Sequence, residues 1–263
     1  MPIRSRARAA ANSILRPMGI RLSAVDPYVD REWFYPPVPS CQIPTLPHLL
    51  EFFLGKRDDG TFVEIGAFDG ISYSNTWGLA GRGWAGFMAE PVPALAAKCR
   101  KNHEIHPKVH VIQTAVGNYQ GSTSLLVAGE FTTANQAQAA EYRDTAWAHK
   151  KLTETSIEVP MTTLDNLLEE NKVSANFDLL VVDVEGFEGA VFEGFTVSRW
   201  LPKMIIAELA DTHPDLSVTA ASDAMLSAEV EADGYRIVYK DSINTVFVHQ
   251  DVAAATYKDL TSR

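Results

Sequence analysis

Along most of the chain, the pattern of apolar and polar positions predicts strands that alternate with helices. Three short apolar segments, 61–65, 84–89 and 109–113, are predicted as strands. Two further apolar runs, 177–184 and 203–209, are typical of strands buried on both faces of a sheet. The helices expected around these strands cover residues 48–54, 74–79, 93–102, 188–195 and 223–233. This order predicts an α/β fold with a doubly wound, mostly parallel sheet covered by helices on both faces.

The middle and the end of the chain follow a different pattern. Segments 235–239 and 245–249 predict a closing hairpin. Segment 122–127 alternates like a hairpin strand, and 156–160 is its expected partner or an edge strand. Residues 129–155 are polar and rich in alanine, so we expect a mobile or partly helical insertion over the site.

Three parts of the chain differ in composition. Residues 1–47 combine a basic leader with an arm rich in proline and aromatic residues, which cannot form a regular helix. Residues 48–250 are expected to form the domain that carries the insertion, and 251–263 a C-terminal tail. The arm is expected to pack on the domain, to help close a pocket, or to contact a second copy in a homo-oligomer.

The charge balance limits the partners. The chain has 33 acidic and 23 basic residues and a formal net charge of −10. A surface that follows a phosphate backbone needs an excess of Lys and Arg. We therefore expect a partner other than a nucleic acid.

The leader is the one strongly basic segment, because five arginines precede the first acidic residue, Asp26. It predicts an amphipathic helix on an anionic membrane or a partner, a frayed end interrupted by Pro17 and Gly19, or a presequence. No apolar run reaches the roughly 18 residues of a membrane-spanning helix. Cys41 and Cys99 show no pattern of pairs and are expected to be free thiols. The free thiols predict a reducing, cytoplasmic compartment, and the basic leader offers peripheral contact with a membrane as an alternative.

The first candidate motif is FVEIGAFDG, residues 62–70. It places Glu64 and Asp69 around a turn with Gly66 and Gly70, at the end of a predicted strand, where doubly wound sheets bind ligands. Gly66 allows a sharp turn and a close approach of the backbone to a ligand. The glycine spacing differs from the G-x-G-x-x-G that binds a pyrophosphate. An acidic turn favours a cationic ligand such as S-adenosylmethionine over a dinucleotide, and a purely structural turn is the competing explanation.

Two further motifs follow the next strands. Glu90 and Pro91 end the segment FMAEP, and a carboxylate at this point can accept hydrogen bonds from ribose hydroxyls. Residues 114–117, TAVG, offer small side chains and backbone groups that would flank an adenine. The three strand ends together predict a nucleoside-containing cofactor.

The fourth motif is DLLVVDVEGFEGAVFEGF, residues 178–195. Asp183 and Glu185 end an apolar strand, where carboxylates without partners are costly, so we expect them to face a polar cleft, a cation or a metal. The competing explanation is that Asp183 caps the next helix. Glu208 ends the neighbouring strand, and together with Asp183 it is a candidate ligand pair for Mg²⁺.

These segments, with VPMTTLDNLL and MIIAELA, stand in an order that resembles the FkbM family of class I S-adenosylmethionine-dependent methyltransferases over about residues 61–248. The resemblance implies a seven-stranded sheet whose last strand is antiparallel. It also implies O-methylation of a sugar, a glycan or a secondary metabolite. The residues expected around the cofactor are Glu64, Gly66, Ala67, Asp69, Gly70, Ser74, Glu90, Pro91, Ala115, Val116 and Asp183.

Methyl transfer to a hydroxyl needs in-line alignment and removal of a proton. We expect Asp183 or Glu185 to accept that proton; His213 is a further candidate base, although a lone loop histidine is more often incidental. Two other functions remain open: an NAD-dependent oxidoreductase, disfavoured by the glycine spacing, and a non-catalytic binding protein that retains the fold.

Overall fold

The computed structural model describes Tyr35, residues 41–145, Ala148 and residues 155–261. The basic leader and most of the arm lie outside the described residues, so the predictions made for them stay predictions. Among the described residues, no helix has the length and apolar character needed to cross a membrane.

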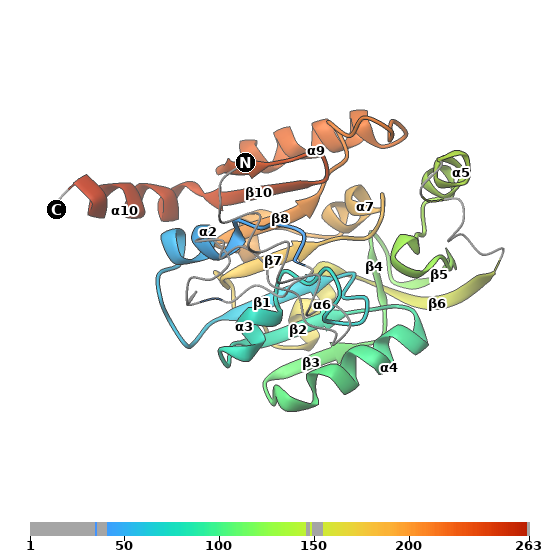
Figure 1. The fold of residues 1–263 in the computed structure, drawn as a ribbon, viewed down its shortest axis with the longest axis horizontal. Helices are drawn as coiled ribbons and strands as arrows, with labels where there is room; N and C mark the ends of the chain where they lie inside the picture. The colour runs from blue at the N-terminus through green and yellow to red at the C-terminus, as the bar shows by residue number, and fades with distance from the viewer. Residues whose placement is uncertain (1–34, 36–40, 146–147, 149–154, 262–263) are drawn as a thin grey trace, which may run out of the picture. The chain divides into compact units, whose positions relative to one another are not determined.

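The main sheet has seven strands in the order β3-β2-β1-β7-β8-β10-β9 (Figure 1). Every neighbouring pair is parallel except the two that involve β10, which runs antiparallel to both β8 and β9. The predicted doubly wound sheet with an antiparallel last strand is therefore confirmed. The strands are β1 Thr61–Ile65, β2 Ala85–Ala89, β3 Val109–Ile112, β7 Leu179–Val182, β8 Met204–Glu208, β9 Tyr235–Lys240 and β10 Asn244–His249.

Strand order reverses between β1 and β7, and this point fixes where a ligand binds. From β1 the chain proceeds outward to β2 and β3, whereas β7 leads to the strands on the other side. The two following connections therefore diverge and leave a crevice at the carboxyl ends of β1 and β7. The motifs at Glu64–Gly66 and Asp183–Glu185 meet at this crevice.

Helices cover both faces of the main sheet, as the unbroken apolar run of β7 requires. Leu179 and Val181 point into one apolar cluster, with Leu50 of α2 and Leu79 of α3. The alternate β7 residues point into the opposite cluster, which contains side chains of α6, α7, α8 and α9. The helices are α2 Leu46–Phe53, α3 Trp77–Gly81, α4 Pro93–Asn102, α5 Gln136–Asp144, α6 Leu164–Glu170, α7 Glu188–Glu193, α8 Val197–Trp200, α9 Ala220–Ala232 and α10 Gln250–Thr261; two short 3-10 helices, η2 His103–Ile105 and η3 Gly129–Phe131, complete the set.

A second, three-stranded sheet lies between β3 and α6 in the chain, with the order β4-β6-β5. Its strands are β4 Ala115–Gly117, β5 Gly121–Leu126 and β6 Ser156–Thr163. The antiparallel pairing of β5 with β6 is one of the two alternatives expected for 156–160, whereas no strand was predicted over 115–117. Instead β4 pairs in parallel with β6 and packs Ala115 against Leu125 and Met161.

The insertion and the tail acquire regular structure. Helix α5 makes part of the insertion helical, while residues 146–147 and 149–154 lie outside the described residues. Most of the segment expected as a C-terminal tail forms α10. This helix packs on α2, where Tyr257 lies edge-on to Phe52 and Phe53.

The amino end of β7 carries a buried carboxylate with three partners. Asp178 accepts hydrogen bonds from the Thr61 backbone amide at 2.9 Å, from Arg57 at 2.9 Å and from Lys203 at 2.7 Å. Both cations are about one-third exposed, while the Asp178 side chain is 5% exposed. These contacts join β1, β7 and the segment before β8 at the edge opposite the crevice.

Candidate functional site

A cavity opens at the carboxyl ends of β1, β2 and β7, where the switch of strand order predicts a ligand. All the residues expected around the cofactor line this cavity, except Asp69 and Gly70. Glu185 lines it as well, and His213 does not. Those that line it are Glu64, Gly66, Ala67, Ser74, Glu90, Pro91, Ala115, Val116 and Asp183.

The lining has two chemically different parts. An apolar part contains Leu95, Ala115, Leu125 and Phe187, which belong to the cluster built on the second sheet. An acidic part contains Glu64, Glu130, Asp183 and Glu185. None of the described residues that line the cavity carries a basic side chain. The cavity therefore offers an apolar surface and a negative potential to one ligand.

Gly66 is required by the protein backbone itself. Its φ is +89°, and a Cβ at this position would lie 1.7 Å from the carbonyl oxygen of Asp183. The strands are drawn together there, because the Asp183 amide donates to Ile65 at 2.9 Å and the Gly66 amide donates to Ala89 at 3.0 Å. Gly66 thus makes room for the chain at the end of β7. The sequence alone suggested that a glycine here allows a ligand to approach the backbone closely, whereas the close neighbour in the structure is Asp183.

Asp69 and Gly70 build the turn without lining the cavity. The Asp69 carboxylate accepts hydrogen bonds from the amides of Ile71 and Ser72 and from Lys98. Burial raises the pKa of Asp69, but these hydrogen bonds outweigh it and lower the pKa to about 2. A Cβ on Gly70 would lie 2.8 Å from the Cys99 sulfur. Both residues therefore fix the shape of the turn and do not line the cavity.

Glu64 is buried beneath the acidic part of the cavity. Its carboxylate accepts a 2.7 Å hydrogen bond from the Thr76 hydroxyl. Burial raises the pKa of Glu64 to about 8, and the negative charge of Asp183 contributes in the same direction. Glu64 thus holds a proton near neutral pH until a cation replaces it.

Glu90 follows β2 and binds the turn after β1. Its two carboxylate oxygens accept hydrogen bonds from the amides of Phe68 at 2.9 Å and Val92 at 2.8 Å. Burial raises its pKa to about 7 despite these bonds. Each oxygen retains a second lone pair, so Glu90 can still accept from a ligand hydroxyl.

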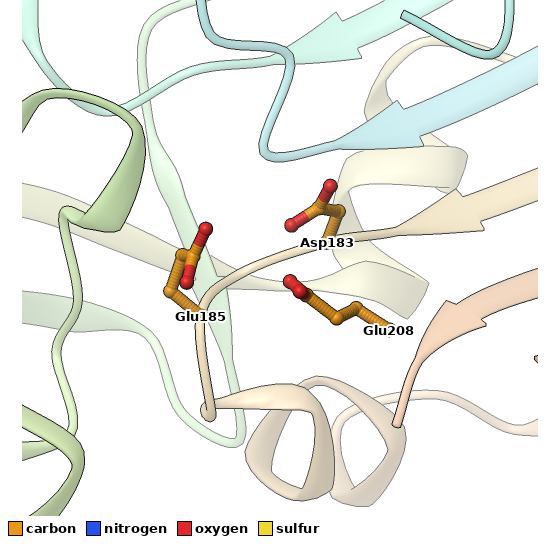
Figure 2. Close-up of side chains that lie close together, drawn as sticks. All are labelled: Asp183, Glu185 and Glu208. Carbon is orange, nitrogen blue, oxygen red and sulfur yellow. The ribbon is translucent and has the colours of Figure 1, made fainter. Parts of the chain in front are cut away.

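Three carboxyl groups converge at the ends of β7 and β8, and we call Asp183, Glu185 and Glu208 the acidic trio (Figure 2). One oxygen of each lies within 4.8 Å of the others. The Asp183 side chain lies beside Glu208 and the Gln42 side chain. Among the described residues, Glu208 Oε2 has no hydrogen-bond partner.

The trio cannot carry three full charges in this setting. Burial raises the pKa of Asp183. Burial and the charge of Asp183 raise the pKa values of Glu185 and Glu208 well above the usual range. Full charge on all three groups would place three negative charges within 4.8 Å of one another. Either protons or a cation must therefore neutralise the trio.

Asp183 does not cap the following helix. The N-cap residue of α7 is Phe187, without a side-chain cap. The carboxylate of Glu188 instead accepts the Val184 amide at 2.9 Å. The purely structural explanation of Asp183 is therefore wrong, and its side chain is available to the cavity.

Two residues at the site carried no specific sequence signal. Gln42 comes from the arm and lines the cavity, in agreement with the expected pocket-closing role of that segment. Tyr142 comes from α5 in the insertion, and its hydroxyl donates to Glu185. His213, by contrast, accepts the amide of Asp215 at 3.0 Å in the loop after β8.

Comparison with known proteins assigns the family. Residues 64–237, more than half of the chain, match the Methyltransferase FkbM domain. The chain belongs to the FkbM methyltransferase family. Membership in this family favours a methyltransferase over an NAD-dependent oxidoreductase. No curated protein matches the sequence.

Solved structures resemble this FkbM family member at low identity. The FkbM methyltransferase of Methylobacillus flagellatus KT is 13% identical with a TM-score of 0.44; the match covers 73% of this chain and 44% of that protein. A putative O-methyltransferase from Klebsiella pneumoniae is 12% identical with a TM-score of 0.46, covering 94% and 99%. The SAH-bound methyltransferase of Podospora anserina is 12% identical with a TM-score of 0.41, covering 72% and 71%. The present chain thus spans less than half the length of the Methylobacillus protein.

Proposed function

We propose that this FkbM methyltransferase transfers the methyl group of S-adenosylmethionine to a hydroxyl of an acceptor without negative charge, such as a neutral sugar, a glycan or a secondary metabolite. The observation that carries the proposal is the cavity lining, which combines an apolar part with acidic side chains and no basic ones among the described residues. The donor has the same division, an adenine at one end and two cationic groups at the other.

The individual contacts support this orientation. The apolar part formed by Leu95, Leu125 and Phe187 suits the adenine ring. Glu90 can accept hydrogen bonds from the ribose hydroxyls. The ammonium and sulfonium groups would then lie near Glu64 and Asp183, whose charged forms they stabilise.

The reaction requires a proton acceptor beside the methyl group. Displacement at the sulfonium methyl needs the acceptor oxygen in line with the breaking bond, and the hydroxyl proton must leave in the transition state. Asp183 and Glu185 line the cavity, and burial raises their pKa values, which makes each carboxylate a stronger base. Either carboxylate could accept the proton.

The acidic trio also fits a divalent cation. Its donors are carboxylate oxygens within 4.8 Å of one another, the ligand type that Mg²⁺ prefers. Asp183, Glu185 and Glu208 would hold the ion, which would lower the pKa of an acceptor hydroxyl bound beside it. Activity with and without a chelator, followed by addition of Mg²⁺, tests this part alone.

Acceptor charge is the feature that the lining discriminates best. A uronic acid or a sugar phosphate would meet Glu130 and Glu185 without a basic side chain to pair with. A neutral polyol avoids that repulsion, and an amino sugar gains from it. Hydroxyl acceptors without negative charge are therefore expected to react best.

Titration calorimetry followed by an acceptor panel tests the proposal. We expect S-adenosylmethionine to bind and NAD not to bind; the reverse result would overturn the proposal. The panel compares glucose, glucosamine, glucuronate and glucose 6-phosphate end groups on otherwise identical glycosides, with S-adenosylhomocysteine as the measured product. Binding of the donor without product from a broad set of acceptors would favour a non-catalytic protein that retains the fold.

A further inference from the structure

We infer that Tyr142 is a positioning residue, which holds Glu185 in the acidic trio and makes helix α5 of the insertion part of the catalytic apparatus. The kinetic part of this inference rests on the proposed function. The geometric part concerns only the contacts between α5 and the chain after β7.

One face of α5 docks on Glu185 and Gly186. Asn135, Gln138 and Tyr142 follow the i, i+3, i+7 spacing of residues on a single helix face. Asn135 donates to the Gly186 carbonyl at 2.7 Å, and Tyr142 donates to the Glu185 carboxylate. A Cβ on Gly186 would lie 2.9 Å from Gln138. The helix therefore contacts the chain after β7 at three successive points.

Asn135 joins the start of the helix to this docking. Its side-chain oxygen caps α5 by accepting the amides of Ala137 at 3.0 Å and Gln138 at 3.2 Å. Its side-chain nitrogen is the group that donates to Gly186. Helix formation and docking on the site thus use the same residue.

The docked segment has a backbone conformation that needs such support. Glu185 has φ +57°, an unfavourable left-handed conformation for a residue with a Cβ, and Gly186 follows with φ +85°. Conformations of this kind persist where surrounding contacts hold them. The turn directs the Glu185 side chain back toward Asp183 and Glu208 (Figure 2). Because Tyr142 binds the carboxylate itself, it fixes the end of the side chain as well as the turn.

A different residue of α5 attaches the helix to the loop before α9. Glu141 accepts the Ser217 amide at 2.7 Å, the Ser217 hydroxyl at 2.8 Å and the Val218 amide at 3.1 Å. The helix is thereby held between this loop and the chain after β7. Tyr142 consequently acts from a support that is fixed on two sides.

The hydroxyl of Tyr142 keeps its proton and donates it to the hydrogen bond with Glu185. Burial, together with the charge of Glu185, raises the pKa of Tyr142 well above its ordinary value of 10.0. Removal of the hydroxyl should therefore release the Glu185 side chain.

Carbon-13 NMR of the glutamate side chains at one fixed pH tests the geometric part. The Glu185 signal is assigned by its loss in E185Q. In Y142F we expect the chemical shift of this signal to change, because the carboxylate loses its donor and the side chain is released. The matched control is Y239F, which loses a 2.7 Å bond to Asp241 away from the cavity and should leave the Glu185 signal in place. An unchanged Glu185 signal in Y142F would overturn the inference. This measurement needs no acceptor, so it stands even if the proposed methyl transfer fails.

Kinetics test the link to catalysis. Y142F should lower kcat about tenfold and leave the KM for S-adenosylmethionine within twofold. The double variant Y142F/E185Q should be no slower than E185Q, because Tyr142 acts through Glu185. Fully additive losses would overturn the inference. If Y142F does not fold, N135A releases the same segment and should also change the Glu185 signal.

Discussion

Two aspartates bracket strand β7, Asp178 before it and Asp183 after it, and their surroundings are opposite. Asp178 has two cations and a backbone amide within 2.9 Å. Asp183 has other carboxyl groups as its neighbours, and burial raises its pKa. The same type of side chain thus has cations beside it at one end of the strand and other carboxyl groups beside it at the other end.

The difference separates stability from function along the sheet. At the amino edge, the chain provides its own counterions and joins adjacent segments. At the carboxyl edge, it gathers carboxylates whose charge a bound cation would compensate. Carboxylates that have no cation beside them in the folded chain are therefore the feature that distinguishes the carboxyl edge of the sheet.

The largest expected effect concerns Asp183. In D183A we expect kcat to fall about 10³-fold, because the variant loses a general base or the group that holds one. The dissociation constant of S-adenosylmethionine should stay within a few-fold, and the melting temperature should not fall, since a buried carboxylate with acidic neighbours is removed. Calorimetry, kinetics and thermal melting measure the three quantities. A fully active D183A would remove this residue from the mechanism.

Asp178 should show the opposite profile. D178N leaves Arg57 and Lys203 without their shared carboxylate, and we expect a loss of about 2 kcal/mol in the free energy of unfolding, moderated by the partial exposure of both cations. Urea denaturation measures this loss. The value of kcat well below the melting temperature should be unchanged, so a severe loss of turnover in a fully folded D178N would contradict the division between the two edges.

The pH dependence of stability sharpens the same comparison. Glu64 has a pKa of about 8 in the folded protein against an ordinary 4.5, so the folded state keeps a proton that the unfolded state releases. Its contribution to stability is complete below about pH 4.5 and is lost as the pH rises toward 8. In E64Q the free energy of unfolding should fall less steeply between pH 5 and 7, with a slope smaller by at most about 1.4 kcal/mol per pH unit. Urea denaturation without ligand at pH 5, 6 and 7 measures it, and equal slopes would exclude Glu64 as a source.

The smallest effect is expected for His213. It does not line the cavity, and its ring accepts the amide of Asp215. H213A should therefore keep kcat within about threefold, whereas removal of a general base costs at least about 100-fold. A loss of that size, with unchanged donor affinity, would move the base from the acidic trio to the loop after β8.

The sequence predicted the main sheet and much of the site because both depend on local signals. An apolar run that ends in a carboxylate identifies a buried strand and its functional end, as Asp183 and Glu208 show. The regular alternation with helices then predicts a parallel sheet, whereas the seven strands and the antiparallel last strand were implied by the family resemblance. The positions of Glu64 and Glu90 at the cavity follow from the same rule.

The remaining features depend on contacts that no local pattern encodes. Residues 115–117 have too few positions to reveal a strand, and only pairing with β6 makes them one. The sequence does not show that Glu64 lines the cavity while Asp69 does not, because the contact of Asp69 with Lys98 joins residues far apart in the chain. Gln42 reaches the cavity from the arm, and Tyr142 reaches Glu185 from the insertion. The composition of these segments indicates that they cover the site but does not specify which side chain makes the contact.

The pairing of β5 with β6 has a consequence for how the specificity of such a protein can change. Leu126 and Ser156 lie opposite each other at the end of this pair, so the insertion leaves and re-enters the sheet at neighbouring positions. A segment with its ends held side by side can vary in length at little cost to the rest of the chain. The insertion can therefore change in length while its two ends stay attached to the sheet, provided that Tyr142 keeps its contact with Glu185.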